Sequence, residues 1–132
     1  MKFMNDFCPC GKLIVYESCC EIIHFDISQA LTAEELMRSR YTAFTKGMGD
    51  YLLLSHHSSA RPLERIGEIV EWANSVIWQS LEVLNTTNGQ SKDTVGTVRF
   101  KASFTLNGRA DFILENSKFT KENGCWMYLG FA

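Results

Sequence analysis

The sequence has no surplus of basic residues: 13 Lys and Arg stand against 15 Asp and Glu, which leaves a net charge of −2. A protein that binds by neutralising many phosphates needs the opposite balance, so we expect no nucleic-acid partner. Long apolar runs are also missing, because a stretch such as Tyr51–Leu54 is far shorter than the roughly 20 residues that cross a bilayer. The first six residues contain no apolar leader segment. We therefore expect a cytoplasmic protein without a membrane partner.

Internal repeats and low-complexity tracts are absent as well. What is present is a chain of 132 residues, of which 45% are hydrophobic and 21% charged. This length and balance are typical of one globular domain and not of a disordered or fibrous chain. One main core with a short appendage is the expected arrangement.

Cysteine is concentrated in one segment. Four of the five cysteines lie between positions 8 and 20, namely Cys8, Cys10, Cys19 and Cys20, while Cys125 stands alone near the other end. In a reducing compartment such a cluster is more typical of a metal site than of disulfides. Free thiols or local disulfides are the alternative, but bridges between cysteines this close in sequence would be strained.

Zinc suits four such ligands, because this ion has no geometric preference of its own and accepts a tetrahedron of thiolates. Cys20 is the preferred fourth ligand, although two consecutive residues must then both turn inward, and His24 competes with it. Four protein ligands leave no open position for water. The site is therefore expected to be structural or a recognition knuckle, and not catalytic.

The most secure helix signal follows the cysteines. Thr32–Glu35 has the pattern of a capping box, in which Thr32 and Glu35 satisfy each other's backbone amides. Apolar residues then recur at helical spacing, at Met37, Tyr41, Phe44 and Met48, before two glycines end the helix. Two shorter helices are expected, one beginning at Asp50 and one at Pro62.

The second half of the chain has the period-2 pattern of strands. Alternation is clearest over 97–106, and further strands are expected over 78–84, after Asn107-Gly108 and over 125–131. We expect a bulged three-residue turn at Gly108, which would place Phe104 opposite Ala110 and Arg99 opposite Glu115. Helices followed by about four antiparallel strands predict an α+β domain with a curved sheet wrapped on the long helix.

The spacing Cys8-Pro9-Cys10-Gly11, Tyr16, Cys19-Cys20 resembles the SEC-C motif, the zinc knuckle at the C-terminus of the SecA translocation ATPase and in small bacterial proteins. It departs from the usual pattern at Lys12-Leu13, where Ser-Gly is common. The segments Thr32–Tyr41, Tyr51–Leu54 and Glu115–Phe119 resemble the YchJ-like family of SEC-C proteins, so that the resemblance covers nearly the whole chain.

This resemblance implies a SEC-C-like zinc knuckle over residues 1–25 and a nuclear transport factor 2-like domain over 26–132. The latter is a cone-shaped α+β fold, also called cystatin-like, and agrees with the order of helices and strands given above. The family has no established activity that the resemblance would transfer. It therefore informs the fold more than the function.

Folds of this kind often enclose a pocket, but fold alone does not decide between enzyme and binding module. The candidate pocket residues are Arg40, Tyr41, His57, Trp78 and Trp126. Arg40 and Tyr41 belong to the long helix, His57 follows the second helix in a His-His pair, and the tryptophans suit core or pocket wall. Whether the chain is an enzyme stays open, and no residue is assigned a catalytic role, because a general base needs geometry that the sequence does not show.

Two hypotheses follow. The first is a non-catalytic binding module whose knuckle docks a protein partner, by analogy with the SecA knuckle, which contacts a chaperone and the ribosome. The second is a small-molecule enzyme or ligand carrier that uses the pocket of the cone. Convergence of Arg40, Tyr41 and a histidine on a pocket would favour the second, and a filled apolar interior the first. The sequence alone favours the first.

Overall fold

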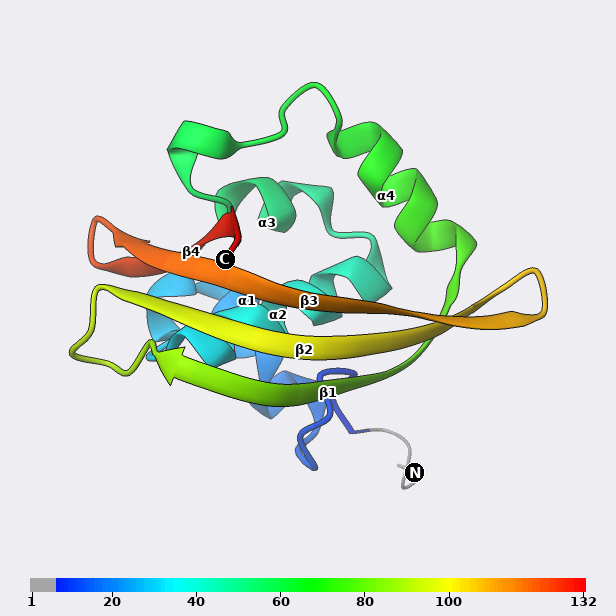
Figure 1. The fold of residues 1–132 in the computed structure, drawn as a ribbon, viewed down its shortest axis with the longest axis horizontal. Helices are drawn as coiled ribbons and strands as arrows, with labels where there is room; N and C mark the ends of the chain where they lie inside the picture. Colours follow the sequence, from blue (N-terminus) through cyan, green and yellow to red (C-terminus); the bar gives the residue numbers. More distant parts are fainter. Residues whose placement is uncertain (1–6) are drawn as a thin grey trace.

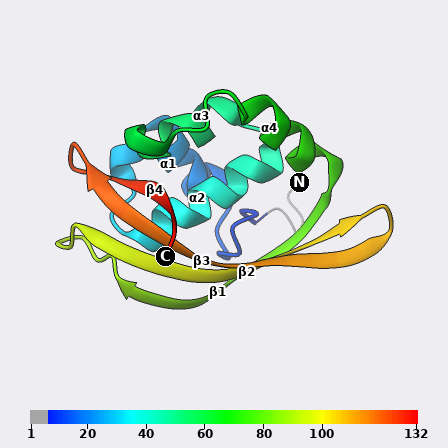
Figure 2. The ribbon, with the colours of Figure 1, turned by 45° about the horizontal axis from the view of Figure 1, so that its top comes forward.

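The computed structural model describes residues 7–132 and consists of one antiparallel sheet with helices on one face (Figure 1). The strands run in the order β1 (Ile77–Asn88), β2 (Val95–Leu106), β3 (Arg109–Glu122) and β4 (Cys125–Phe131). The helices are α1 (Cys20–Phe25), α2 (Ala33–Lys46), α3 (Gly49–Leu54) and α4 (Ile66–Ser75). Figure 2 shows the sheet curving beneath the helices. The predicted α+β class, with helices before a curved sheet, is confirmed.

Helix α2 is the central helix, and local sequence sets both its ends. The Glu35 amide donates to Thr32 Oγ1 at 3.1 Å, while the Glu35 carboxylate accepts from the Leu31 amide at 3.0 Å. The capping pair is therefore present, with the reciprocal bond displaced by one residue. The helix ends at Gly47, whose φ of 66° lies in the left-handed region that glycine adopts without a Cβ clash.

The hairpin between β2 and β3 differs from the expected one. Asn107 and Gly108 form a two-residue turn in which both φ angles are positive, at 52° and 79°, and Leu106 pairs directly with Arg109. This turn matches the twist of the flanking strands, and Asn-Gly is the sequence that adopts it most easily. Phe104 consequently lies opposite Asp111, not Ala110.

The corrected register exchanges the two faces of β3, because side chains alternate along a strand. Arg99 pairs with Asn116 and not with Glu115, and the inner row of β3 becomes Ile113, Glu115, Ser117 and Phe119. Asp111 is solvent-exposed at the end of the hairpin, so this register does not bury its carboxylate. Glu115 is thereby turned toward the helices.

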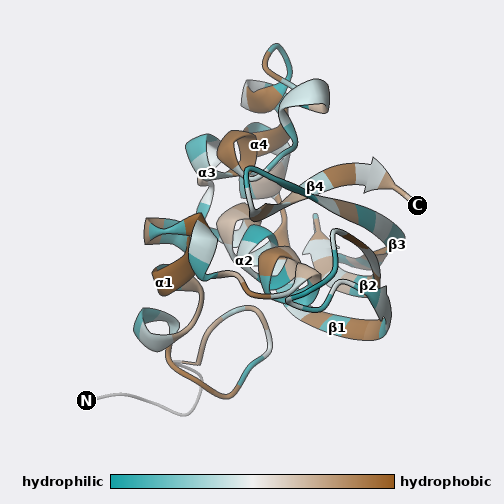
Figure 3. Ribbon diagram, turned by 90° about the vertical axis from the view of Figure 1, so that its left-hand side faces the viewer, coloured by the Kyte–Doolittle hydropathy of each residue, from teal (hydrophilic) through white to brown (hydrophobic). Residues whose placement is uncertain are grey.

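The core lies between α2 and the inner face of the sheet. Its most completely buried large side chains are Leu36, Val98, Phe119 and Trp126. Figure 3 shows apolar stretches on α1 and α4 and mixed hydropathy along the strands. Within residues 7–132, no helix combines the length and apolar character needed to cross a bilayer.

Candidate functional site

The four N-terminal cysteines meet at one point. The Sγ atoms of Cys8, Cys10, Cys19 and Cys20 all lie within 4.8 Å of one another, and those of Cys10 and Cys19 are 3.7 Å apart. Four sulfurs around a tetrahedral ion with metal–sulfur bonds of about 2.3 Å are about 3.8 Å apart, so the donor set fits one zinc-sized ion. All five cysteines of the chain are free thiols, and the alternative of local disulfides is not what the structure shows.

Tight turns in the backbone create this convergence. The Cys8 amide donates to the Ile14 carbonyl at 2.7 Å, which closes a small loop, and Gly11 turns inside it with a φ of 97°. A Cβ at Gly11 would lie 3.3 Å from the Leu81 carbonyl oxygen, so the loop packs closely on β1. Cys19 precedes α1 and Cys20 begins it, which explains how two consecutive residues reach the same point.

His24 does not enter the cluster, because both of its ring nitrogens have other partners. Nε2 lies 2.8 Å from the Ser39 carbonyl, to which it donates, and Nδ1 lies 2.8 Å from the Tyr16 hydroxyl, from which it accepts. Burial lowers the pKa of His24, which favours this neutral ring. Of the two candidate fourth ligands, the structure brings Cys20 to the other cysteines.

Helix α2 holds the knuckle against the main domain. Arg38 Nη1 donates to the Cys10 carbonyl at 2.6 Å, and its Nε pairs with Glu34 at 2.9 Å. Thr42, which is fully buried, donates its hydroxyl to Cys20 Sγ at 3.4 Å and lies 3.7 Å from Cys8 Sγ. Such outer hydrogen bonds orient metal ligands. The knuckle is therefore packed on α2.

The sulfur atoms also influence each other's protonation. Hydrogen bonds from the thiols of Cys10 and Cys20 lower the pKa of Cys8, whereas the bonds that Cys20 donates raise its own pKa. Burial raises the pKa of Cys19 to about 12. Without a counter-charge the cluster thus resists further loss of protons, and a divalent cation is the species that would replace them.

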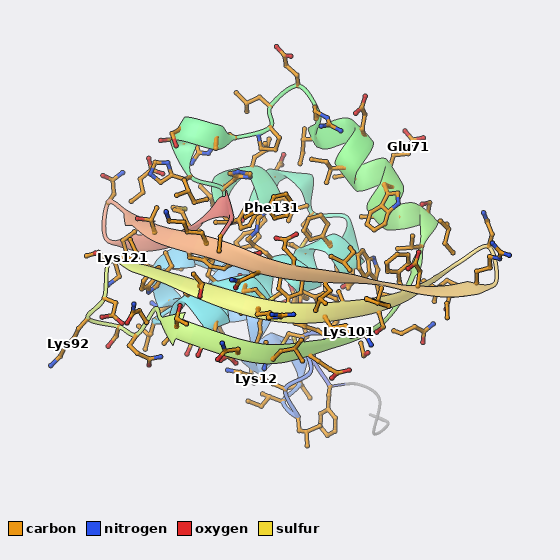
Figure 4. All side chains as sticks on the ribbon, viewed as in Figure 1. Lys12, Glu71, Lys92, Lys101, Lys121 and Phe131 are labelled. Atoms are coloured by element: carbon orange, nitrogen blue, oxygen red, sulfur yellow. The ribbon has the colours of Figure 1, made fainter. Side chains whose placement is uncertain are left out.

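A second feature is a cavity of about 540 Å³ between the helices and the inner face of the sheet. Its walls combine aromatic and aliphatic side chains, and Trp78 is the aromatic residue of the lining with several ring contacts. Trp78 makes edge contacts with Trp72 and Tyr41, each with ring centroids 5.6 Å apart. The exposed residues Arg65 and Phe131 are also in its lining, and Phe131 is labelled in Figure 4.

Arg40 is the charged residue that α2 contributes to this cavity. It is only 8% exposed, and its Nη1 donates to the Leu52 carbonyl at 2.9 Å and to Ser55 Oγ at 2.7 Å. Its guanidinium carbon lies 4.6 Å from the centre of the Tyr128 ring, a cation–π contact. Burial lowers the pKa of Arg40 to about 10, which leaves the group cationic at neutral pH.

Glu115 lines the same cavity as Arg40, and its charge acts on the Arg40 guanidinium. Its Oε2 accepts from the Ser117 hydroxyl and, at 3.3 Å, from the Tyr128 hydroxyl. Burial and the charge of Glu115 raise the pKa of Tyr128 to about 12, so that its hydroxyl remains a donor at neutral pH. No described carboxylate forms an ion pair with Arg40 within 4.0 Å.

Of the five residues expected in the pocket, Arg40, Tyr41 and Trp78 lie in the cavity wall. The other two are elsewhere. His57 caps the turn at Ser58–Ala60 by accepting from the Ser59 amide, and Trp126 is buried with its indole nitrogen donating to the Leu31 carbonyl at 3.2 Å.

The histidine in the cavity is His56, whose ring packs edge-on against Tyr128 at 4.9 Å. Burial, followed by the nearby charge of Arg40, lowers the pKa of His56 to about 4. Glu115, Ser117 and Tyr128 also line the cavity and were not among the pocket residues predicted from the sequence. The Asn107-Gly108 turn was the available signal, because its two-residue form places Glu115 and Ser117 on the inner face.

Comparisons with known proteins agree with this architecture. Residues 32–130 match the YchJ_M-like family, described as "YchJ, middle NTF2-like domain". A UPF0225 protein of Streptomyces coelicolor is 40% identical over 121 residues, covering 92% of this chain and 90% of the relative. The chain belongs to the YchJ-like family. A second UPF0225 protein, from Vibrio parahaemolyticus, is 39% identical over 96% of this chain and 74% of its own length.

Two solved structures of SEC-C motif containing proteins are similar to nearly the whole chain. The solution structure of RPA3114, a SEC-C motif containing protein from Rhodopseudomonas palustris, has a TM-score of 0.84, 29% identity, and coverage of 95% of this chain and 96% of that one. The crystal structure of a SEC-C motif containing protein from Psychrobacter arcticus has a TM-score of 0.80 and 29% identity, covering 98% and 83%. The expected YchJ-like family and nuclear transport factor 2-like fold are confirmed.

Proposed function

We propose that this YchJ-like protein is a zinc-stabilised, non-catalytic binding protein whose cavity takes a small molecule. The observation that supports the choice is the cavity of about 540 Å³, on which Arg40, Tyr41 and His56 converge. This is the arrangement that separates a small-molecule site from a filled apolar interior. It reverses the order of the two hypotheses that the sequence suggested.

In this proposal Cys8, Cys10, Cys19 and Cys20 hold Zn²⁺ as a structural ion. Four sulfur ligands leave no open position for a water molecule. The contacts of Arg38 and Thr42 with the cluster support the same role, because they tie the knuckle to the central helix of the domain. Since free thiolates require reducing conditions, we place the protein in the cytoplasm.

Elemental mass spectrometry of protein purified without chelator tests the metal. We expect about one zinc per chain, which is lost from the Cys10→Ser and Cys20→Ser variants. The lone Cys125 supplies the matched control, because Cys125→Ser is expected to keep the metal. Zinc-free wild-type protein with titratable thiols would contradict the zinc proposal and leave the cavity proposal untouched.

The non-catalytic assignment follows from the groups in the cavity. With a pKa of about 4, His56 is a weak base at neutral pH. The hydroxyl of Tyr128 and that of Ser117 are both bound to Glu115. These groups are suited to holding a ligand by hydrogen bonds.

Binding of the neutral fluorescent dye N-phenyl-1-naphthylamine tests whether the cavity takes a small molecule. We expect saturable binding at about one dye per chain to the wild type. Ala102, which is buried in the wall, is the site for blocking: Ala102→Phe should abolish dye binding while the folded signal in circular dichroism persists. Equal dye binding by a folded Ala102→Phe variant, or none by the wild type, would contradict cavity binding.

Docking of a protein partner through the knuckle is the second candidate. Leu13 and Phe25, close in sequence to the cysteines, are 79% and 86% exposed, the two highest values among the large apolar side chains of the described residues. Co-sedimentation with purified bacterial ribosomes tests the analogy with the SecA knuckle. Phe25→Ser should weaken co-sedimentation, whereas Phe112→Ser, on the outer face of the sheet, should not. Wild-type protein that stays in the supernatant would argue against this candidate.

A further inference from the structure

We infer that the cavity selects a neutral, flat and largely apolar molecule that presents a hydrogen-bond acceptor beside a hydrogen-bond donor, as a cyclic amide does. The inference rests on the proposed cavity-binding function and gives it a ligand class. Its basis is the pair formed by the buried Arg40 and the half-buried Glu115, which both line the cavity without forming an ion pair.

Arg40 offers donors that the protein does not use. Its hydrogen bonds to described residues all leave from Nη1, so Nε and Nη2 have no partner there. In the part of the chain that the structure describes, no fully buried side-chain nitrogen or oxygen lacks a partner. The free Nε–Nη2 edge of a side chain that is only 8% exposed must therefore reach the cavity that Arg40 lines. Because a guanidinium only donates hydrogen bonds, a ligand that binds this edge needs a hydrogen-bond acceptor.

Glu115 offers the complementary group. Both hydrogen bonds that it accepts from described residues, from Ser117 and from Tyr128, go to Oε2. Oε1 has no hydrogen bond from a described residue and is therefore not fully buried, and because Glu115 belongs to the cavity lining, we place this oxygen at the cavity. A carboxylate oxygen only accepts hydrogen bonds. A ligand that satisfies this end of the cavity needs a donor next to its acceptor.

The charges of the cavity favour a neutral ligand. The cation of Arg40 and the carboxylate of Glu115 already balance, and His56 is uncharged at neutral pH. Arg65 adds a charge only at the rim, where its side chain is 75% exposed and screened by water. An anionic or cationic ligand would leave one uncompensated charge among buried groups, which is costly in a water-poor site.

The aromatic part of the cavity wall determines the shape of the apolar part of the ligand. Phe44, Trp72, Trp78 and Phe100 line the cavity, and the rings of Phe44 and Trp72 are inclined to that of Trp78 by 48° and 80°. Aromatic side chains arranged in this way accept another flat ring through stacked or edge-on contacts. The polar pair and the aromatic wall together describe a flat apolar ring system with one amide-like edge.

Isothermal titration calorimetry with three probes of similar size tests the inference. 2-Quinolone has the cyclic amide edge, 1-methyl-2-quinolone lacks its N–H donor, and 2-naphthoate replaces the edge by a carboxylate. We expect 2-quinolone to bind the wild type about tenfold more tightly than either of the others, because both of them lack the N–H that donates to the Glu115 carboxylate. Comparable or tighter binding of 2-naphthoate, or equal binding of both quinolones, would overturn the inference.

Glu115→Gln supplies a crossed test, because it keeps the shape of the side chain and removes its charge. 2-Quinolone should lose about tenfold in affinity, while 2-naphthoate should gain, since Arg40 is then left without its counter-charge. Glu82→Gln makes the same chemical change on the exposed side of β1 and should alter neither. Unchanged affinities in a folded Glu115→Gln variant would overturn the role of Glu115. If that variant fails to fold, the order of the affinities of the three probes for the wild type decides the question.

The dye experiment separates this inference from the proposed function. If N-phenyl-1-naphthylamine binds the wild type and is displaced by none of the three probes, the cavity is a ligand site but the ligand class is wrong. If neither the dye nor any probe binds, the proposed function itself fails. Displacement of the dye by 2-quinolone at about tenfold lower concentration than by either of the other probes supports both.

Discussion

Thr42 is the residue of the main domain in closest polar contact with the sulfur cluster, and the Thr42→Val variant tests that contact. The valine keeps the shape of the side chain and replaces the hydroxyl with a methyl group. The hydroxyl that is lost donates to Cys20 Sγ at 3.4 Å from a fully buried position. Loss of such a bond to a ligand typically costs a factor of about 10 to 100 in metal affinity, or roughly 1.4 to 2.7 kcal/mol.

Competition for zinc with a chromophoric chelator measures this effect at constant pH. Thr45→Val is the matched control. Thr45 Oγ1 donates to the Thr42 carbonyl at 2.7 Å, so this substitution also removes a hydroxyl and its hydrogen bond, one turn along the helix and away from the sulfurs. We expect Thr42→Val to bind zinc about 10-fold to 100-fold more weakly, and Thr45→Val to bind within about twofold of the wild type.

Equal zinc affinity in the wild type and the Thr42→Val variant would refute the reasoning. It would mean that the four sulfurs hold the ion without help from α2. The contact between Thr42 and the knuckle would then serve packing alone.

Three further outcomes follow from single residues. Gly108→Ala should lower the free energy of unfolding in urea by about 1 kcal/mol, because Gly108 has a φ of 79° in a tight turn; an unchanged value would contradict the turn. Gly67→Ala should instead raise it by about 0.5 to 1 kcal/mol, because Gly67 lies within α4 and a Cβ there meets no atom within 4 Å. His56 should titrate near a pKa of about 4 by proton NMR, below its ordinary 6.5. The unfolded chain then takes up this proton first, so the stability that the neutral ring contributes is lost as pH falls from 6.5 toward 4, and titration near 6.5 would contradict its burial.

The elements predicted well were those encoded by neighbours in sequence. The capping pair of Thr32 and Glu35 marks the beginning of α2, the alternation over 97–106 marks β2, and the spacing of the cysteines marks their cluster. Each of these signals acts over a few residues, so no knowledge of tertiary contacts is needed to interpret it.

The polar end of the cavity depended instead on the register of one hairpin. A three-residue turn at Gly108 keeps Ala110, Phe112 and Leu114 on the apolar face, which is why the sequence pattern favoured it. In the structure Phe112 and Leu114 are about half exposed, and the inner row contains Glu115. A change of one residue in register exchanges every side chain between the two faces. The one misjudged turn therefore hid Glu115.

The choice between His56 and His57 failed for a related reason. The two residues are adjacent, and only the path of the chain after α3 decides which ring faces inward. His57 donates its amide to the Tyr128 carbonyl, which leaves the His56 ring against the Tyr128 ring. Contacts of this kind, between residues far apart in sequence, are not visible in the local pattern.

Helix α2 is shared by the knuckle and the cavity, and this makes the two features parts of one arrangement. Arg38 and Thr42, one turn apart, face the cysteine cluster, whereas Arg40 and Tyr41 line the cavity. Ser39 joins them from within the helix: its carbonyl accepts from His24 in α1, and its hydroxyl lies 2.6 Å from that of Tyr51 in α3. The position of Arg40 thus depends on a helix that the knuckle clamps on its opposite side, so a structural ion in the knuckle would act on the cavity by fixing the place of α2.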